Sequence, residues 1–96
     1  MTIEELQRRI EETYFERDAA RGLGGTFMWF MEEVGELATA LREGDAAAME
    51  EEFADVMAWL CTLASLSRVR MQDAVKKYAD GCPRCRTIPC CCSEKA

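Results

Sequence analysis

The sequence predicts an all-α fold with about four helices per chain. Apolar residues recur three and four positions apart through most of the chain, a spacing typical of amphipathic helices. The chain contains no run of alternating apolar and polar residues and no Asn-Gly hairpin turn, so it gives no signal for a β-strand. Its 96 residues, 49% of them hydrophobic and 31% charged, are typical of one globular domain.

The first two helices are expected at residues 3–20 and 26–43. Thr2 is a suitable N-cap for the first helix, and Glu5 stands three residues later at the capping-box position. Residues 21–25 contain three glycines. Because glycine is costly inside a helix, we expect this segment to separate the two helices.

The second helix is expected to end at Gly44, and Asp45 is a suitable N-cap for a third helix ending near residue 67. The second helix carries an apolar stripe that we expect to face the core, made of Phe27, Met31, Val34, Ala38 and Leu41. The third helix carries a similar stripe, made of Phe53, Val56, Met57, Leu60, Leu63 and Ala64. These two stripes predict that the helices pack together.

A fourth helix is expected at residues 71–80, with Gly81 as its end. The sequence therefore predicts a helical domain over residues 1–80 and a short cysteine-rich tail over residues 81–96.

The charge is unevenly distributed along the chain, whose net charge is −6. Residues 1–67 carry 5 basic and 15 acidic side chains, a balance of −10, whereas residues 68–96 carry 7 basic and 3 acidic ones, a balance of +4. An acidic body disfavours nucleic-acid binding, which relies on neutralising phosphates. The chain shows no secretion signal and no apolar run long enough for a membrane helix. We therefore expect a cytoplasmic protein that binds neither nucleic acid nor membranes.

Two acidic clusters, Glu32-Glu33-x-x-Glu36 and Glu52-x-x-Asp55, lie on the second and third expected helices. Carboxylates three residues apart share a helix face, and both clusters flank an apolar stripe. Carboxylates that converge there repel one another unless a cation lies between them. All-oxygen ligands in a chain without histidine favour Mg²⁺ or Mn²⁺. We expect such a site at Glu33, Glu36, Glu52 and Asp55; the alternative is a pair of solvated helix faces.

The two acidic clusters, with fifteen residues between them, closely resemble the paired motif of the MazG-like nucleotide pyrophosphohydrolases, in the all-α NTP pyrophosphohydrolase superfamily. Residues 26–31, which lead into the first cluster, match the family as well. Lys77-Tyr78 resembles its lysine–aromatic pair. The resemblance covers about residues 20–80.

The resemblance implies Mg²⁺-dependent hydrolysis of a nucleoside triphosphate between the α and β phosphates, giving a nucleoside monophosphate and pyrophosphate. It implies that Glu32 completes the site or activates water, and that Lys77 and Lys76 contact phosphates. Trp29 would stack on the base, although a core or interface tryptophan is an equal alternative. The resemblance also implies a homodimer or homotetramer whose helices complete a bundle.

Two other functions remain open at this stage. The first is hydrolysis of another pyrophosphate compound, such as a nucleoside diphosphate, a phosphoribosyl-nucleotide or a signalling nucleotide. The second is a non-catalytic module that binds a nucleotide or a partner. The products formed would distinguish the enzymes, and turnover would distinguish either enzyme from the binding module.

The tail contains the spacing C-x2-C-x4-C-x-C, formed by Cys82, Cys85, Cys90 and Cys92. Four thiolates at such spacing suit a tetrahedral structural Zn²⁺, with Cys91 as an alternative ligand. A disulfide or thiol switch, an iron–sulfur cluster and an inert tail are the other readings. Cys61, inside the third expected helix, is interpreted as an ordinary buried thiol.

Overall fold

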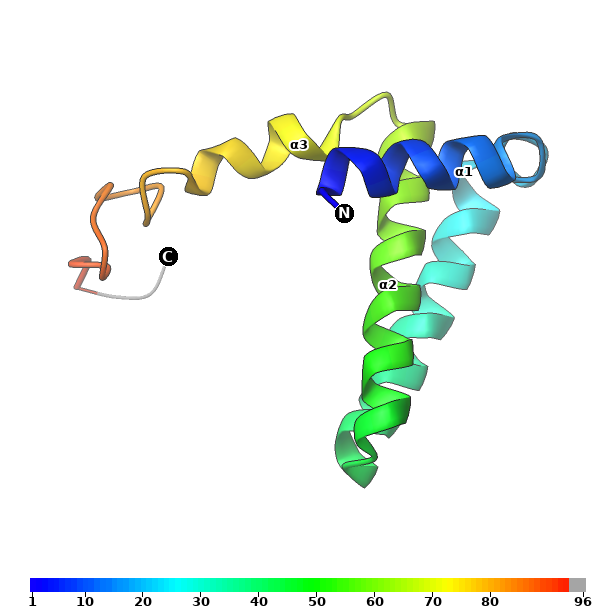
Figure 1. The fold of residues 1–96 in the computed structure, drawn as a ribbon, viewed down its shortest axis with the longest axis horizontal. Helices are drawn as coiled ribbons and strands as arrows, with labels where there is room; N and C mark the ends of the chain where they lie inside the picture. The colour runs from blue at the N-terminus through cyan, green and yellow to red at the C-terminus, as the bar shows by residue number, and fades with distance from the viewer. Residues whose placement is uncertain (94–96) are drawn as a thin grey trace.

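The computed structural model describes residues 1–93, and in that part of the chain every regular element is a helix. The elements are α1 (Ile3–Glu43), α2 (Ala46–Leu66), α3 (Met71–Ala74) and the 3₁₀ helix η1 (Val75–Tyr78) (Figure 1). The predicted all-α class is confirmed. The number of helices differs from the prediction, because the first two expected helices are joined and the last is shortened.

α1 contains both of the first two expected helices, joined across a kink at Gly22. Thr2 and Glu5 form the expected capping box: the Thr2 hydroxyl accepts from Glu5 N at 3.1 Å, and the Glu5 carboxylate accepts from Thr2 N at 2.8 Å. The expected separation over residues 21–25 was wrong in extent, since only Gly22 leaves helical dihedral angles (φ 78°, ψ 172°). Glycine adopts this positive φ without strain, so a single residue redirects the chain.

The part of α1 before the kink runs across the end of α2 (Figure 1). Gln7, buried at 6% exposure, fixes this crossing. Its amide nitrogen donates to Ser65 Oγ at 3.0 Å and to the Val69 carbonyl at 2.9 Å, and its oxygen accepts from Met71 N at 2.8 Å. One buried amide thus joins α1, the end of α2 and the start of α3.

The part of α1 after the kink lies beside α2, and the two run in opposite directions (Figure 1). The turn between them has the predicted caps. Gly44 ends α1 in the left-handed conformation (φ 72°) and donates to the Ala40 carbonyl at 2.9 Å. The Asp45 carboxylate accepts from Ala47 N at 3.0 Å and from Ala48 N at 3.2 Å. This short turn makes α1 and α2 an antiparallel pair.

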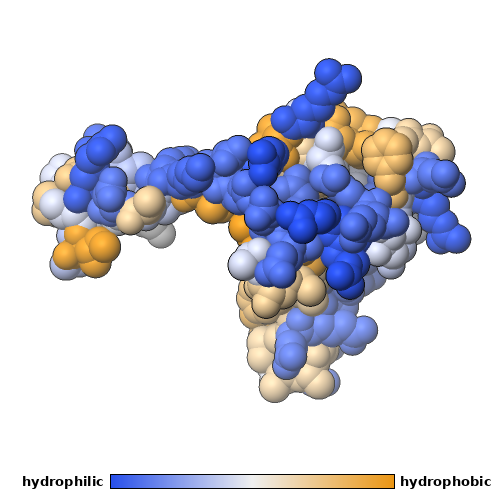
Figure 2. Space-filling model, turned by 45° about the horizontal axis from the view of Figure 1, so that its top comes forward, coloured by the Kyte–Doolittle hydropathy of each residue, from blue (hydrophilic) through white to orange (hydrophobic). Residues whose placement is uncertain are grey.

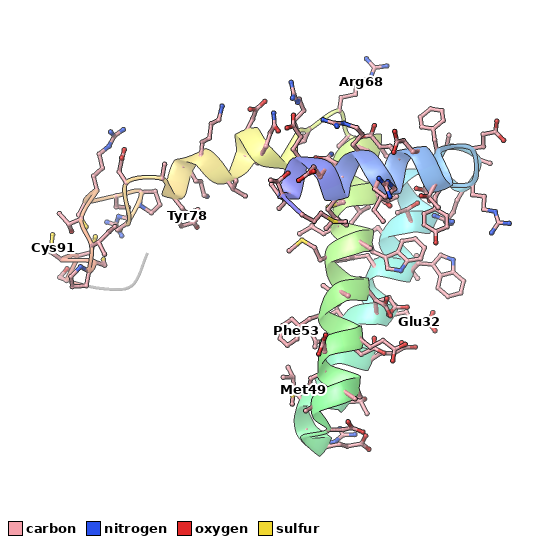
Figure 3. The ribbon with its side chains drawn as sticks, viewed as in Figure 1. Glu32, Met49, Phe53, Arg68, Tyr78 and Cys91 are labelled. Atoms are coloured by element: carbon pink, nitrogen blue, oxygen red, sulfur yellow. The ribbon has the colours of Figure 1, made fainter. Side chains whose placement is uncertain are left out.

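The face of α1 that the structure buries is not the predicted apolar stripe. Thr26 and Ala40 are buried, at 0% and 4% exposure, whereas Phe27 and Met31 are 49% and 47% exposed. On α2, Phe53 is also exposed and points away from α1 (Figure 3). Two helices bury only one face of each other, so within one chain these apolar side chains lie at the surface. Figure 2 shows apolar surface along the antiparallel pair of α1 and α2, beside a strongly hydrophilic region.

The fourth expected helix is only partly α-helical. α3 has 4 residues and continues as η1, also of 4 residues, before the chain becomes irregular. These elements extend away from α1 and α2 as a separate arm (Figure 1). Only the start of α3 contacts α1, and residues 73–80 are exposed. A short helix with so little packing is marginal in water. Within the described residues, no helix combines the length and apolar character needed to cross a bilayer.

Candidate active site

Three carboxylates from the two acidic clusters meet between α1 and α2. Glu33 and Glu36 of α1 and Glu52 of α2 each offer an oxygen, and these oxygens all lie within 4.8 Å of one another. The antiparallel packing produces this arrangement, because positions one turn apart on α1 face positions one turn apart on α2. We call these three residues the acidic trio.

Two oxygens of the acidic trio are buried without a hydrogen-bond partner, Glu33 Oε2 and Glu52 Oε2. Glu33 and Glu52 are half-buried, and Glu36 is exposed. A buried carboxylate oxygen without a donor or cation costs free energy, so native structures rarely leave one unsatisfied. A bound cation would remove this cost.

The electrostatics of the acidic trio are those of crowded carboxylates. Burial, together with the negative charges of Glu36 and Asp55, raises the pKa of Glu33 from 4.5 to about 7. Burial also raises the pKa of Glu52, with the charges of Glu36 and Asp55 adding to the effect. Glu33 and Glu52 therefore resist ionising, and a bound cation would reverse this tendency.

These residues fit a hard divalent cation. The donor set is entirely carboxylate oxygen, two of the oxygens lack partners, and a groove of about 250 Å³ borders Glu36 and Glu52. Mg²⁺ and Mn²⁺ prefer such ligands, and Mg²⁺ uses few carboxylates and keeps water or phosphate in its other positions. The groove leaves room for those additional ligands.

The MazG nucleotide pyrophosphohydrolase domain matches residues 24–85, which is well over half of the chain. The chain belongs to the MazG family. The matched segment contains the acidic trio and the arm as far as Cys85. A comparison with curated proteins finds no significant match. The chain therefore carries a nucleotide pyrophosphohydrolase domain, as the resemblance of its acidic clusters predicted.

The other two acidic candidates of this MazG domain lie beside the trio rather than in it. Asp55 is half-buried on α2 and is close enough to raise the pKa of Glu33. It is not one of the three residues whose carboxylate oxygens all lie within 4.8 Å of one another. Glu32 is exposed on α1 (Figure 3). The structure thus brings together three of the four expected ligands, with the fourth nearby.

A pair of stacked tryptophans lies one helical turn from the acidic residues. Trp29 precedes Glu33 by four residues and Trp59 follows Asp55 by four, so the same packing brings both indoles together. Their ring centroids are 6.3 Å apart and their planes differ by 13°. Trp29 remains 48% exposed, so part of its indole is accessible to a ligand.

Next to this pair is a group of residues that the sequence reasoning missed. The Arg21 guanidinium lies 4.9 Å from the centre of the Trp59 ring and pairs with Asp18 at 3.0 Å. Asp18 is 7% exposed and also accepts from the Thr62 hydroxyl at 3.3 Å. These residues line a cavity of about 280 Å³ with Tyr14 and Arg17. The signal available in the sequence was the three-residue spacing of Asp18 and Arg21, which the expected helix break concealed.

The basic candidates on the arm do not reach the acidic trio within one chain. Lys76, Lys77 and Tyr78 belong to η1, and Figure 3 shows Tyr78 far from Glu32. Lys76 pairs with Asp73 at 3.2 Å, and the Lys77 ammonium lies 5.1 Å from the centre of the Tyr78 ring. In a single chain these side chains therefore contact each other and the arm, not the carboxylates.

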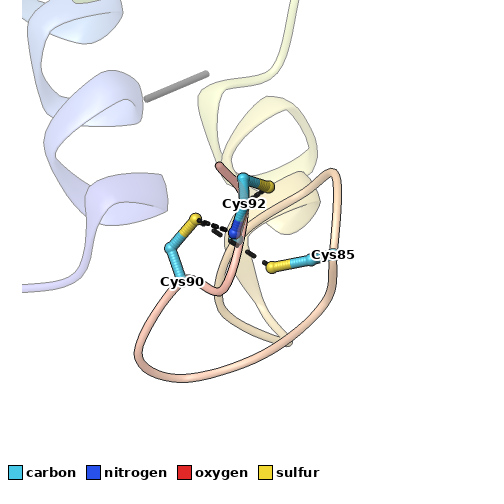
Figure 4. Close-up of side chains that lie close together, drawn as sticks. Cys85, Cys90 and Cys92 are labelled. Atoms are coloured by element: carbon cyan, nitrogen blue, oxygen red, sulfur yellow. Dashed lines mark hydrogen bonds between the residues drawn. The ribbon is translucent and has the colours of Figure 1, made fainter. Parts of the chain in front are cut away.

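The tail brings together the sulfurs of Cys82, Cys85, Cys90 and Cys92, all within 4.8 Å of one another. Figure 4 shows three of these residues, Cys85, Cys90 and Cys92. Hydrogen bonds from the Thr87 hydroxyl and the Cys91 backbone lower the pKa of Cys85 to about 5. Among the described residues Cys61 is the buried cysteine, at 0% exposure, and burial raises its pKa. The interpretation of Cys61 as an ordinary buried thiol therefore agrees with its position in α2.

Proposed function

We propose that this MazG domain hydrolyses a nucleoside triphosphate between its α and β phosphates, using Mg²⁺ or Mn²⁺, and releases a nucleoside monophosphate and pyrophosphate. The observation that supports the proposal is the acidic trio with its two unpartnered buried oxygens. A polyphosphate would be repelled by these carboxylates alone. A metal held by them would attract it instead.

The acidic residues have three different parts in this proposal. Glu33, Glu36 and Glu52 hold the ion, and Asp55 adds negative charge beside it. When bound, the ion neutralises phosphate charge and lowers the pKa of a coordinated water. Glu32, exposed next to Glu33, is the candidate to accept the proton of the attacking water because it is not needed as a ligand.

The tryptophan pair and its neighbours are suited to hold the nucleoside. Trp29 offers a partly exposed indole on which a base can stack, and Trp59 stacks against that indole. Arg21 places a positive charge beside the pair. The base would then lie one turn from the metal, which leaves the α and β phosphates next to the acidic trio.

A second copy of the chain is needed to complete the site in this proposal. The exposed stripe with Phe27 and Met31 would pack against the partner, as a helical bundle requires. Lys76, Lys77 and Tyr78 on the projecting arm would then contact phosphates held by the other copy. Residues 1–80 act as the catalytic unit, either as a homodimer or as a homotetramer, and the tail is a separate unit.

The test is pyrophosphate release from a panel of ribo- and deoxyribonucleoside triphosphates, with Mg²⁺ or Mn²⁺ present. Glu36→Gln and Asp55→Asn should reduce the rate at least about 100-fold, because each removes a charge next to the ion. Glu50→Gln is the matched control, since Glu50 is exposed on α2 outside the trio.

Each outcome of this assay has a clear meaning. Metal-dependent pyrophosphate release that Glu36→Gln and Asp55→Asn abolish, and that Glu50→Gln does not, would support the proposal. Release of orthophosphate from a nucleoside diphosphate, with no activity on triphosphates, would assign the same centre to another pyrophosphate compound. Nucleotide binding without any turnover would replace the enzyme with a binding module.

A further inference from the structure

The four cysteines of the tail have the spacing of a tetrahedral metal site. Cys82 and Cys92 place their sulfurs 3.8 Å apart, and Cys85 and Cys90 place theirs 4.0 Å apart. With metal–sulfur bonds of about 2.3 Å, the corners of a ZnS₄ tetrahedron are about 3.8 Å apart. All four residues are free thiols, so no disulfide explains their approach.

The backbone around the first two cysteines forms a closed loop. Arg86 N donates to the Cys82 carbonyl at 2.6 Å, and Cys82 N donates to the Thr87 carbonyl at 3.2 Å. Gly81 has a φ of 95°, and a Cβ there would lie 2.6 Å from the Thr87 oxygen. Only glycine fits this approach, so the chain is built to bring residues 85–87 back against residues 81–82.

Hydrogen-bond donors are directed at the sulfurs of Cys85 and Cys90. Cys91 N donates to Cys85 Sγ at 3.4 Å, and Cys92 N donates to Cys90 Sγ at 3.3 Å. The Thr87 hydroxyl lies 2.9 Å from Cys85 Sγ. Hydrogen bonds of this kind stabilise thiolates and orient them as metal ligands.

The tail has no apolar core that would hold this shape. None of its described residues is fully buried, and Ile88, its largest aliphatic side chain, is 81% exposed. A segment this small needs a metal or disulfides to stay folded. With no disulfide present, a bound ion would hold the closed loop and the converging sulfurs together.

We propose that Cys82, Cys85, Cys90 and Cys92 bind a single structural Zn²⁺, independently of the acidic trio. All-sulfur tetrahedral ligands select zinc or iron, and a cluster with sulfide between its metals would spread the thiolates farther than one ion does. Cys91 lies outside the four-sulfur group and is not a ligand. The ion makes the tail a rigid unit that carries the exposed Arg84 and Arg86 at the end of the arm (Figure 1).

The experiment measures the metal content of the full chain purified under reducing conditions without chelator. Wild type and Cys91→Ser should contain one zinc per chain, whereas Cys85→Ser and Cys92→Ser should retain about a tenth or less. Circular dichroism should show unchanged helix content in all four proteins, because α1 and α2 do not depend on the tail.

A second measurement uses the metal-free protein titrated with Co²⁺. Wild type should develop the visible bands of a tetrahedral cobalt–thiolate site at one equivalent, and Zn²⁺ should displace them; Cys85→Ser should not develop them. Iron with acid-labile sulfide in the purified protein would overturn the proposal. The proposal would also be overturned if Cys91→Ser lost as much zinc as Cys85→Ser and Cys92→Ser. A wild type that binds neither Zn²⁺ nor Co²⁺ through its thiolates would overturn it as well.

Discussion

Mg²⁺ binding at the acidic trio should compete with protons at and below neutral pH. The pKa of Glu33 is raised to about 7, so this carboxyl is largely protonated in the metal-free protein at mildly acidic pH. The metal binds the ionised form, and binding must therefore release the proton. The perturbation is a change of pH from about 8 to about 5.5, a range in which an ordinary carboxyl stays ionised.

The size of the effect follows from the pKa of Glu33. For a single carboxyl with a pKa of about 7, the change in pH lowers metal affinity about 30-fold, whereas a pKa of 4.5 would lower it only about 1.1-fold. Glu33 is half-buried, and solvent screens part of the interaction that raises its pKa. We therefore expect a fall of about 10- to 30-fold.

The assay is isothermal titration calorimetry with Mg²⁺ or Mn²⁺ in buffers of different ionisation enthalpy, which also counts the released protons. Glu33→Gln is the control: it should bind metal more weakly at about pH 8, and its affinity should change little with pH. An affinity that is constant from about pH 8 to about 5.5 would refute the reasoning. An equally steep dependence in Glu33→Gln would assign the effect to other groups.

Three further predictions follow from the same structure. In chelator, the melting temperature should fall as the pH rises from about 5.5 to about 8. The raised pKa of Glu33 gives a contribution to the free energy of unfolding that is fully present below pH 4.5 and is lost as the pH rises through about 7. Glu33→Gln should remove the trend. Met31→Glu should weaken self-association about 100-fold or more in sedimentation experiments, because it places a charge in the proposed interface; an unchanged mass would exclude that interface. Gln7→Ala should lower the unfolding free energy by about 2–3 kcal/mol in denaturant titrations, since it leaves buried partners unsatisfied; the exposed Arg9→Ala should change it little.

The local features of the fold were predictable because they depend on neighbouring residues. The capping box of Thr2 and Glu5, the end of α1 at Gly44 and the N-cap at Asp45 were all confirmed. The extent of the break near Gly22 was not predictable, because the following glycines stay helical in a segment that packs against α2. The short α3 likewise reflects how little of the arm packs against α1 rather than a local signal.

The sequence by itself determined the helical class, the family and the acidic clusters proposed to hold the metal, because spacing along a helix decides which side chains share a face. Only the tertiary structure decided which face is buried. Antiparallel packing placed Glu33 against Glu52 and left Phe27 and Met31 at the surface. It also brought Asp18 and Arg21 next to Trp59, and it left Tyr78 on the arm far from Glu32 (Figure 3). These relations depend on how distant segments cross, which local periodicity does not encode.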